Sequence, residues 1–173
     1  MSYYVVDVET DGASPMRSSM VCFGAVKVTD KLDETFYGEV APINNTWNPE
    51  ALAISGFSRE EHKKFPLPAM TIRKFHDWVL QTNEGGRPIF WSDNLAFDWM
   101  WMACYFDMLN MENPFGWSGR RIGDVYTGFY KEPNKKWKHL RKTKHTHHPV
   151  DDAKGNAEVL LHMKNDLGIK FKF

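Results

Sequence analysis

The chain has 173 residues, 42% of them hydrophobic and 14% aromatic, and its 22 Lys and Arg residues equal its 22 Asp and Glu residues in number. This length and apolar content predict one domain over residues 1–173 with a substantial buried core. The balanced charge excludes an overall basic field, and the lack of both a leader-like opening and a run of about 20 apolar residues predicts a cytoplasmic protein with no membrane partner.

The first elements in chain order are three strand-like segments, at residues 3–9, 20–28 and about 35–40. The short connections between them favour an antiparallel meander. Residues 44–64 then form a region of loops and short helix. Ile72, Phe75 and Val79 share one helical face, which predicts a helix over about residues 68–81.

The second half of the chain alternates strand and helix. Its predicted elements are a buried strand at 87–92, a helix at 94–109, a short strand end with a helix at 122–130, and a helix at 150–166 that contains Gly155. A meander followed by this alternation is typical of an α/β domain with a mixed sheet.

The first predicted strand carries two acids, Asp7 and Glu9, at alternate positions. Because side chains alternate across a strand, both carboxylates point to one face while Val6 and Val8 are buried on the other. Like charges held this close repel each other unless a proton or a cation intervenes, and Mg²⁺ or Mn²⁺ is the usual cation for an all-oxygen site. One Asp-x-Glu pair also arises by chance in a chain of this composition, so further ligands have to decide the question.

Two more acids lie near the starts of predicted helices, where further ligands would have to come from. Asp98 follows the strand at residues 87–92, and Asp152 follows Pro149. An acid in the first turn of a helix also complements the helix dipole by about 0.3–1 kcal/mol. Each of these acids, taken singly, therefore fits a structural role as well as a metal-binding role.

Three motifs together resemble those of the DEDDh subgroup of 3′-to-5′ exonucleases, which includes oligoribonuclease, ribonuclease T and polymerase proofreading subunits. They are Asp7-Val8-Glu9-Thr10, Asn94-Leu95-Ala96-Phe97-Asp98 and His147-His148-Pro149-Val150-Asp151-Asp152-Ala153, in that order. The resemblance implies a ribonuclease H-like α/β fold. Its mixed sheet would have five to six strands, an antiparallel meander first and parallel strands after, flanked by helices.

The resemblance also implies roles for the residues that match. The carboxylates that hold two Mg²⁺ or Mn²⁺ ions would be Asp7, Glu9, Asp98 and Asp152, with Asp7 between the ions. His147 would be the general base because the family places its His five residues before the last Asp, and His148 is the competing candidate. An unperturbed imidazole titrates near pH 6.5, so activity should rise with pH through neutrality.

Substrate contacts are expected beside these motifs. A nuclease that acts at a 3′ end holds the terminal base by stacking, which contributes about 1–3 kcal/mol per base. The expected substrate-binding residues are Val8, Thr10, Asn94 and Phe97, together with Gly56 and Phe57 of Ser55-Gly56-Phe57-Ser58, which resembles a family element beside the terminal nucleotide. The basic segment before His147 offers phosphate contacts through Lys138, Arg141, Lys142 and Lys144, although such a charge run is also typical of a solvated loop.

The sequence therefore predicts a metal-dependent 3′-to-5′ exonuclease that acts on single-stranded 3′ ends and releases nucleoside 5′-monophosphates. RNA is preferred over DNA because the chain is similar to compact exoribonucleases such as the mycobacterial ribonuclease AS group. Three alternatives stay open: an exodeoxyribonuclease of the repair or proofreading type, a non-catalytic nucleic-acid-binding module, and a zinc hydrolase that uses Asp7 and the His residues at 145–148. Such relatives often form homodimers, and the helix at Trp99–Met108 is a candidate interface, although packing in the core explains its composition equally well.

Overall fold

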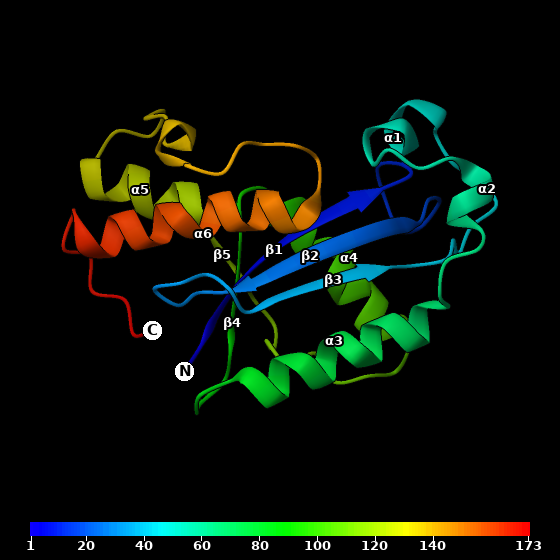
Figure 1. Cartoon of the computed structure of the whole chain (residues 1–173), viewed down its shortest axis with the longest axis horizontal. Helices are drawn as coiled ribbons and strands as arrows, with labels where there is room; N and C mark the ends of the chain where they lie inside the picture. The colour runs from blue at the N-terminus through cyan, green and yellow to red at the C-terminus, as the bar shows by residue number, and fades with distance from the viewer.

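The computed structural model, which describes residues 1–173, centres on a mixed sheet of five strands in the order β3-β2-β1-β4-β5 (Figure 1). β1 pairs antiparallel with β2 and parallel with β4. The outer strand β3 pairs antiparallel with β2, and the outer strand β5 pairs parallel with β4. The strands are β1 Tyr3–Thr10, β2 Met20–Lys27, β3 Thr35–Glu39, β4 Ile89–Ser92 and β5 Arg120–Arg121. The predicted α/β class, with a meander first and parallel strands after, is confirmed.

Helices cover both faces of the sheet. They are α1 Pro49–Ile54, α2 Arg59–His62, α3 Pro68–Thr82, α4 Leu95–Met108, α5 Ile122–Tyr130 and α6 Pro149–Asn165, with a 3₁₀ turn η1 at Lys138–Leu140. In Figure 1, α5 and α6 lie on one side of the sheet and α3 on the other. None of these helices combines the length and the apolar content that crossing a membrane requires.

Two hydrophobic cores, one on each face, decide which way the side chains of β1 point. Val6 and Val8 pack in the core that contains α3 and α4, whereas Tyr3 and Val5 pack in the core that contains α5 and α6. Strand alternation then places Asp7 on the α6 face, in line with Tyr3 and Val5. The first strand therefore presents its acids toward the start of α6.

Two local features differ from the simplest expectation. The segment at 122–130 is helical throughout, and the short strand lies just before it at Arg120–Arg121. Gly155 does not interrupt α6, and a Cβ at this position would lie 3.0 Å from the carbonyl oxygen of Thr143. Glycine there lets the basic segment pack closely on the helix.

Candidate metal and nucleic-acid site

The site begins where β1 meets α6. Asp7 is opposite Gly24 in the antiparallel pairing of β1 with β2. A Cβ on Gly24 would lie 2.4 Å from the backbone of Pro149 and Val150, so only glycine lets the first turn of α6 approach this closely. This approach brings Asp152, in that first turn, to the acids of β1.

Three of the four predicted carboxylates come together. Oxygen atoms of Asp7, Glu9 and Asp152 all lie within 4.8 Å of one another. Asp98 is not in this group, but it lies next to it, with 4% of its surface exposed. The pairing of β1 with β4 ends at Val5. Further along β1, the Val8 N–H donates to Asp98 Oδ1 at a distance of 3.1 Å.

The acidic cluster concentrates unbalanced negative charge. Burial, together with the nearby carboxylates of Asp98 and Asp152, raises the pKa of Asp7 well above its usual range. Burial and the Asp7 charge raise the pKa of Glu9 to about 8, and burial raises the pKa of Asp98 to about 7 despite the hydrogen bond from the Val8 N–H. Carboxylates that resist ionisation in this way are a fitting ligand set for divalent cations, which would replace the protons.

The loop before α6 wraps around the Asp152 carboxylate. The backbone N–H groups of Thr146 and His147 donate to its two oxygens, both at 3.1 Å. His147 adopts a left-handed backbone with φ of 61°. Its Nδ1 lies 3.8 Å from Glu9 Oε1, and half of its side chain is exposed. The ring of His148 instead stacks on Tyr37, with centroids 5.1 Å apart, which favours His147 as the histidine of the site.

A pocket of about 320 Å³ opens beside the acids. The predicted residues Val8, Glu9, Thr10 and Phe97 line it, together with Gly12, Ala13 and, from the α1 region, Asn48, Ala51 and Ile54. Sequence reasoning missed the α1 wall. Asn48 is an N-cap beside a proline, a local signal for a helix start, but its place beside β1 depends on a long-range hydrogen bond from the Asn48 N–H to the Asp11 carbonyl at 2.7 Å.

Three predicted substrate-binding residues are not among those that line this pocket. Asn94 is the N-cap of α4, where its side chain makes no capping hydrogen bond. Gly56 is exposed, with φ of 79°. Phe57 is half-buried and packs edge-on against Phe65, with centroids 4.9 Å apart, because its apolar ring lies against the small core that contains Leu52 of α1.

Comparison with known proteins identifies the family. A model of the 3'-5' exoribonuclease Rv2179c-like domain matches residues 2–163. The chain belongs to this Rv2179c-like family. It is also similar to the 3'-5' DNA exonuclease Cap18 of Escherichia coli, with 31% identity over 125 residues that cover 71% of this chain and 66% of Cap18.

Solved structures share the fold of this Rv2179c-like domain. The nuclease domain of 3'hExo, a DEDDh family member bound to rAMP, superposes with a TM-score of 0.77 and 18% identity over 95% of this chain and 92% of that one. Exonuclease I of E. coli in complex with a dT13 oligonucleotide gives a TM-score of 0.74 and 16% identity over 95% of this chain. The chain spans only 41% of exonuclease I, and about two thirds of Cap18. The fold is therefore that of the DEDDh exonucleases, as the motifs predicted.

Arg141 of the Rv2179c-like domain was expected to contact phosphate, and in the structure its side chain also makes contacts within the protein. Its side chain is only 9% exposed; it donates to Asn156 Oδ1 and lies 3.4 Å from Asp93 Oδ2. Its charge lowers the pKa of Asp7, against the larger effects of burial and the acids. Arg141 therefore brings a compensating positive charge close to the acids.

The other basic residues of the segment remain at the surface. Lys138 is 63% exposed, with its Nζ 2.5 Å from Asp93 Oδ2. A polar depression of about 270 Å³ is lined by Lys138, Arg141, Lys142, Thr143, Lys144 and His145, and so reaches the histidine loop. All four predicted phosphate-binding residues thus line one depression that reaches the histidine loop.

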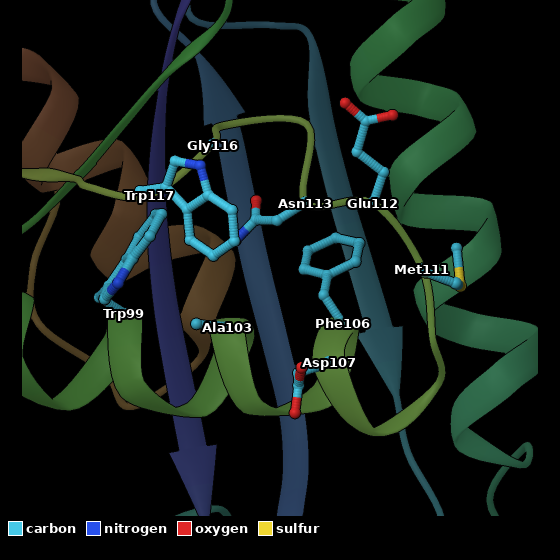
Figure 2. Close-up of a pocket in the computed structure, with 9 residues that line it drawn as sticks. All are labelled: Trp99, Ala103, Phe106, Asp107, Met111, Glu112, Asn113, Gly116 and Trp117. Atoms are coloured by element: carbon cyan, nitrogen blue, oxygen red, sulfur yellow. The ribbon is translucent and has the colours of Figure 1, made fainter.

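A further pocket of about 290 Å³ lies on α4, away from the acids (Figure 2). Figure 2 shows the side chains of Trp99 and Phe106 projecting from α4 toward the loop that carries Trp117. Trp117 is 95% exposed and Met108 is 45% exposed. α4 therefore contributes Trp101 and Phe106 to the core and Met108 to the surface.

Proposed function

We propose that this domain is a metal-dependent 3′-to-5′ exonuclease that removes nucleoside 5′-monophosphates from single-stranded nucleic acid. The observation that carries the proposal is the meeting of Asp7, Glu9 and Asp152 within 4.8 Å, with the His147 imidazole beside them. Family membership supports the same activity. A binding module without turnover would not need this complete set of acids and histidine.

In this proposal, Asp98 joins the three clustered acids in holding two Mg²⁺ or Mn²⁺ ions, with Asp7 between them. Such a pair of ions, when bound, would neutralise charge on the scissile phosphate and lower the pKa of the attacking water. His147 accepts the proton of that water, because its ring is open to solvent and faces Glu9. Asp98 is buried and Asp7 is half-buried, whereas half of the His147 side chain is exposed, so the proton leaves through the histidine.

The terminal nucleotide would occupy the pocket beside Glu9, whose volume is in the range of small-ligand sites. Phe97 offers a ring for stacking, and Val8 and Thr10 line the pocket on either side of Glu9 in the chain. The preceding phosphates would follow Lys142 and Lys144 along the polar depression. Such contacts predict a steep loss of affinity with salt.

We propose RNA as the preferred substrate, on the strength of the family description. The similarity to Cap18, a DNA exonuclease, supports DNA as the second candidate. Discrimination requires a contact to the 2′-hydroxyl. In the nucleotide pocket, the Asn48 side-chain oxygen caps α1 and leaves the amide N–H₂ to donate to a sugar. Homodimer formation through α4 and a cytoplasmic location stay predictions.

The test is hydrolysis of a 5′-labelled single strand, as RNA and as DNA of matched sequence, with Mg²⁺ or Mn²⁺. We expect shortening from the 3′ end that stops when that end is blocked. Asp152→Asn should abolish it, and His147→Ala should slow it by about 10²–10⁴-fold, the usual contribution of a general base. The matched control is His148→Ala, whose ring stacks on Tyr37 outside the acids. Full activity of Asp152→Asn, or equal losses in the two histidine variants, would contradict the proposal.

A further inference from the structure

The histidine loop forms a second group of metal-ligand type, which shares only Asp152 with the acidic cluster. Ligand atoms of His145, His147 and Asp152 all lie within 4.8 Å of one another. His145 Nδ1 is 2.7 Å from Asp152 Oδ2, and the two imidazole centroids are 4.3 Å apart. The exonuclease roles proposed above use His147 and Asp152 and leave His145 without a task.

The backbone holds this group in place. Thr146 and His147 donate their N–H groups to the two oxygens of Asp152, and the Thr146 hydroxyl donates to Asp151 Oδ2 at 3.1 Å. The left-handed conformation of His147 turns the chain so that the imidazoles before and after Thr146 lie over the same carboxylate. Supporting hydrogen bonds of this kind orient metal ligands in proteins.

The donor chemistry differs from that of the acidic cluster. Oxygen-only ligands suit Mg²⁺ and Mn²⁺, whereas imidazole nitrogen favours Zn²⁺ and its neighbours in the first transition series. Two imidazoles and one carboxylate with open solvent access match a three-ligand zinc site whose fourth position is filled by water. The side chains of His145 and His147 are 53% and 50% exposed, and that of Asp152 is 1% exposed. The buried Asp152 carboxylate would therefore be a fixed ligand, and the two exposed imidazoles could rotate to meet the ion.

The distances also suit a zinc ion after small movements. Tetrahedral zinc with bonds of about 2.0–2.1 Å separates its ligand atoms by about 3.3 Å. His145 Nδ1 would retreat slightly from its 2.7 Å contact with Asp152, and the His147 ring would turn inward. Any proton shared between His145 and Asp152 would pass to solvent as the metal binds.

We propose that His145, His147 and Asp152 form a zinc site, and that zinc held there inhibits hydrolysis. The ion would engage the imidazole nitrogen of His147 and an oxygen of Asp152, and so withdraw both from the Mg²⁺-dependent reaction. The inhibitory half rests on the proposed exonuclease function. The binding half depends only on the three side chains.

The test measures Zn²⁺ binding to the metal-free whole chain by competition with a chromogenic chelator, in excess Mg²⁺. We expect one equivalent to bind, and His145→Ala to weaken it by at least about 10-fold, since even the loss of outer supporting contacts costs about 10–100-fold. His139→Ala is the matched control, an exposed histidine of the same basic segment outside the group. Zinc K-edge absorption should show two imidazole ligands in the original protein and one in His145→Ala.

Hydrolysis assays then read the inhibitory half separately. Zinc should inhibit Mg²⁺-dependent hydrolysis, and the concentration for half-inhibition should rise in His145→Ala by the same factor as the dissociation constant. Equal zinc affinity in His145→Ala and His139→Ala would overturn the site, because the ion would then sit on the acidic cluster. Zinc binding that depends on His145, in a chain without hydrolysis under any divalent ion, would overturn the exonuclease function and leave the site standing.

Discussion

Replacing Gly24 by alanine tests how the site is assembled without touching a proposed ligand. The added Cβ would lie 2.4 Å from the carbonyl carbon of Pro149 and from the nitrogen of Val150, whereas ordinary contact begins at 3.4 Å. The start of α6 therefore has to retreat by about 1 Å, the difference between these distances. Both atoms belong to backbone, so no side-chain rotation relieves the clash.

The retreat acts directly on the metal ligands. Gly24 pairs with Asp7, and Asp152 lies in the helix turn that must move, so the substitution separates these two carboxylates. A displacement of 1 Å at a reacting centre costs about 10²-fold in rate. Overpacking of this kind also destabilises by about 1–3 kcal/mol, which leaves a folded protein to measure.

The assay compares hydrolysis rates of Gly24→Ala at saturating Mn²⁺ with its Mn²⁺ affinity by calorimetry. We expect a rate about 100-fold lower and weaker metal binding. The control is Gly128→Ala in α5, where a Cβ would meet no atom within 4 Å. A Gly24→Ala protein that keeps its metal affinity and loses less than a few-fold in rate would refute the argument that close approach of α6 builds the site.

Three further predictions concern charge. Arg59→Ala leaves the fully buried Asp11 without its 2.6 Å partner, so urea unfolding should show a loss of about 3–5 kcal/mol. Burial raises the pKa of Glu9 to about 8 and that of Asp98 to about 7, so the folded chain retains protons that the unfolded chain releases near pH 4. The free energy of unfolding of the metal-free protein, measured by urea titration, should therefore fall between about pH 4 and pH 8. Added Mg²⁺ should offset this fall. Asp7→Asn should weaken Mn²⁺ binding in calorimetry more than Glu9→Gln, because Asp7 is proposed to contact both ions; equal losses would contradict that assignment.

The individual strands and helices were accessible from the sequence because their signals are local. Alternation in residues 3–9 marks β1, and the spacing of Ile72, Phe75 and Val79 marks α3, whose buried face contains all three. Patterns of this kind need only neighbours along the chain. The pairing of β1 with β4, by contrast, joins distant parts of the chain. The expectation of parallel strands is consistent with it, but no single residue indicates it.

The grouping of the site was accessible only in part. The motif spacing indicated Asp7 and Asp152 as partners, although 145 positions of chain separate them and Gly24 controls their approach. No local signal identifies Gly24, since glycine within a strand has several explanations. The internal contacts of Arg141 were likewise hidden, because a basic residue in a basic segment gives no sign of an acid such as Asp93 beside it.

The position of the acids on β1 depends on the absence of a side chain in the neighbouring strand β2 and on the short length of the neighbouring strand β4. On one side, Gly24 of β2 has no side chain, and the backbone of Pro149 and Val150 at the start of α6 fills the space. On the other side, the paired part of β4 stops level with Val5, and Asp98 takes the Val8 N–H that no strand reaches. Both gaps lie next to the C-terminal half of β1, where Asp7 and Glu9 project. A longer β4 or a larger residue at 24 is expected to preserve the fold class and to disturb the grouping of the acids, so the proposed metal site depends on these two local features more than on the sheet itself.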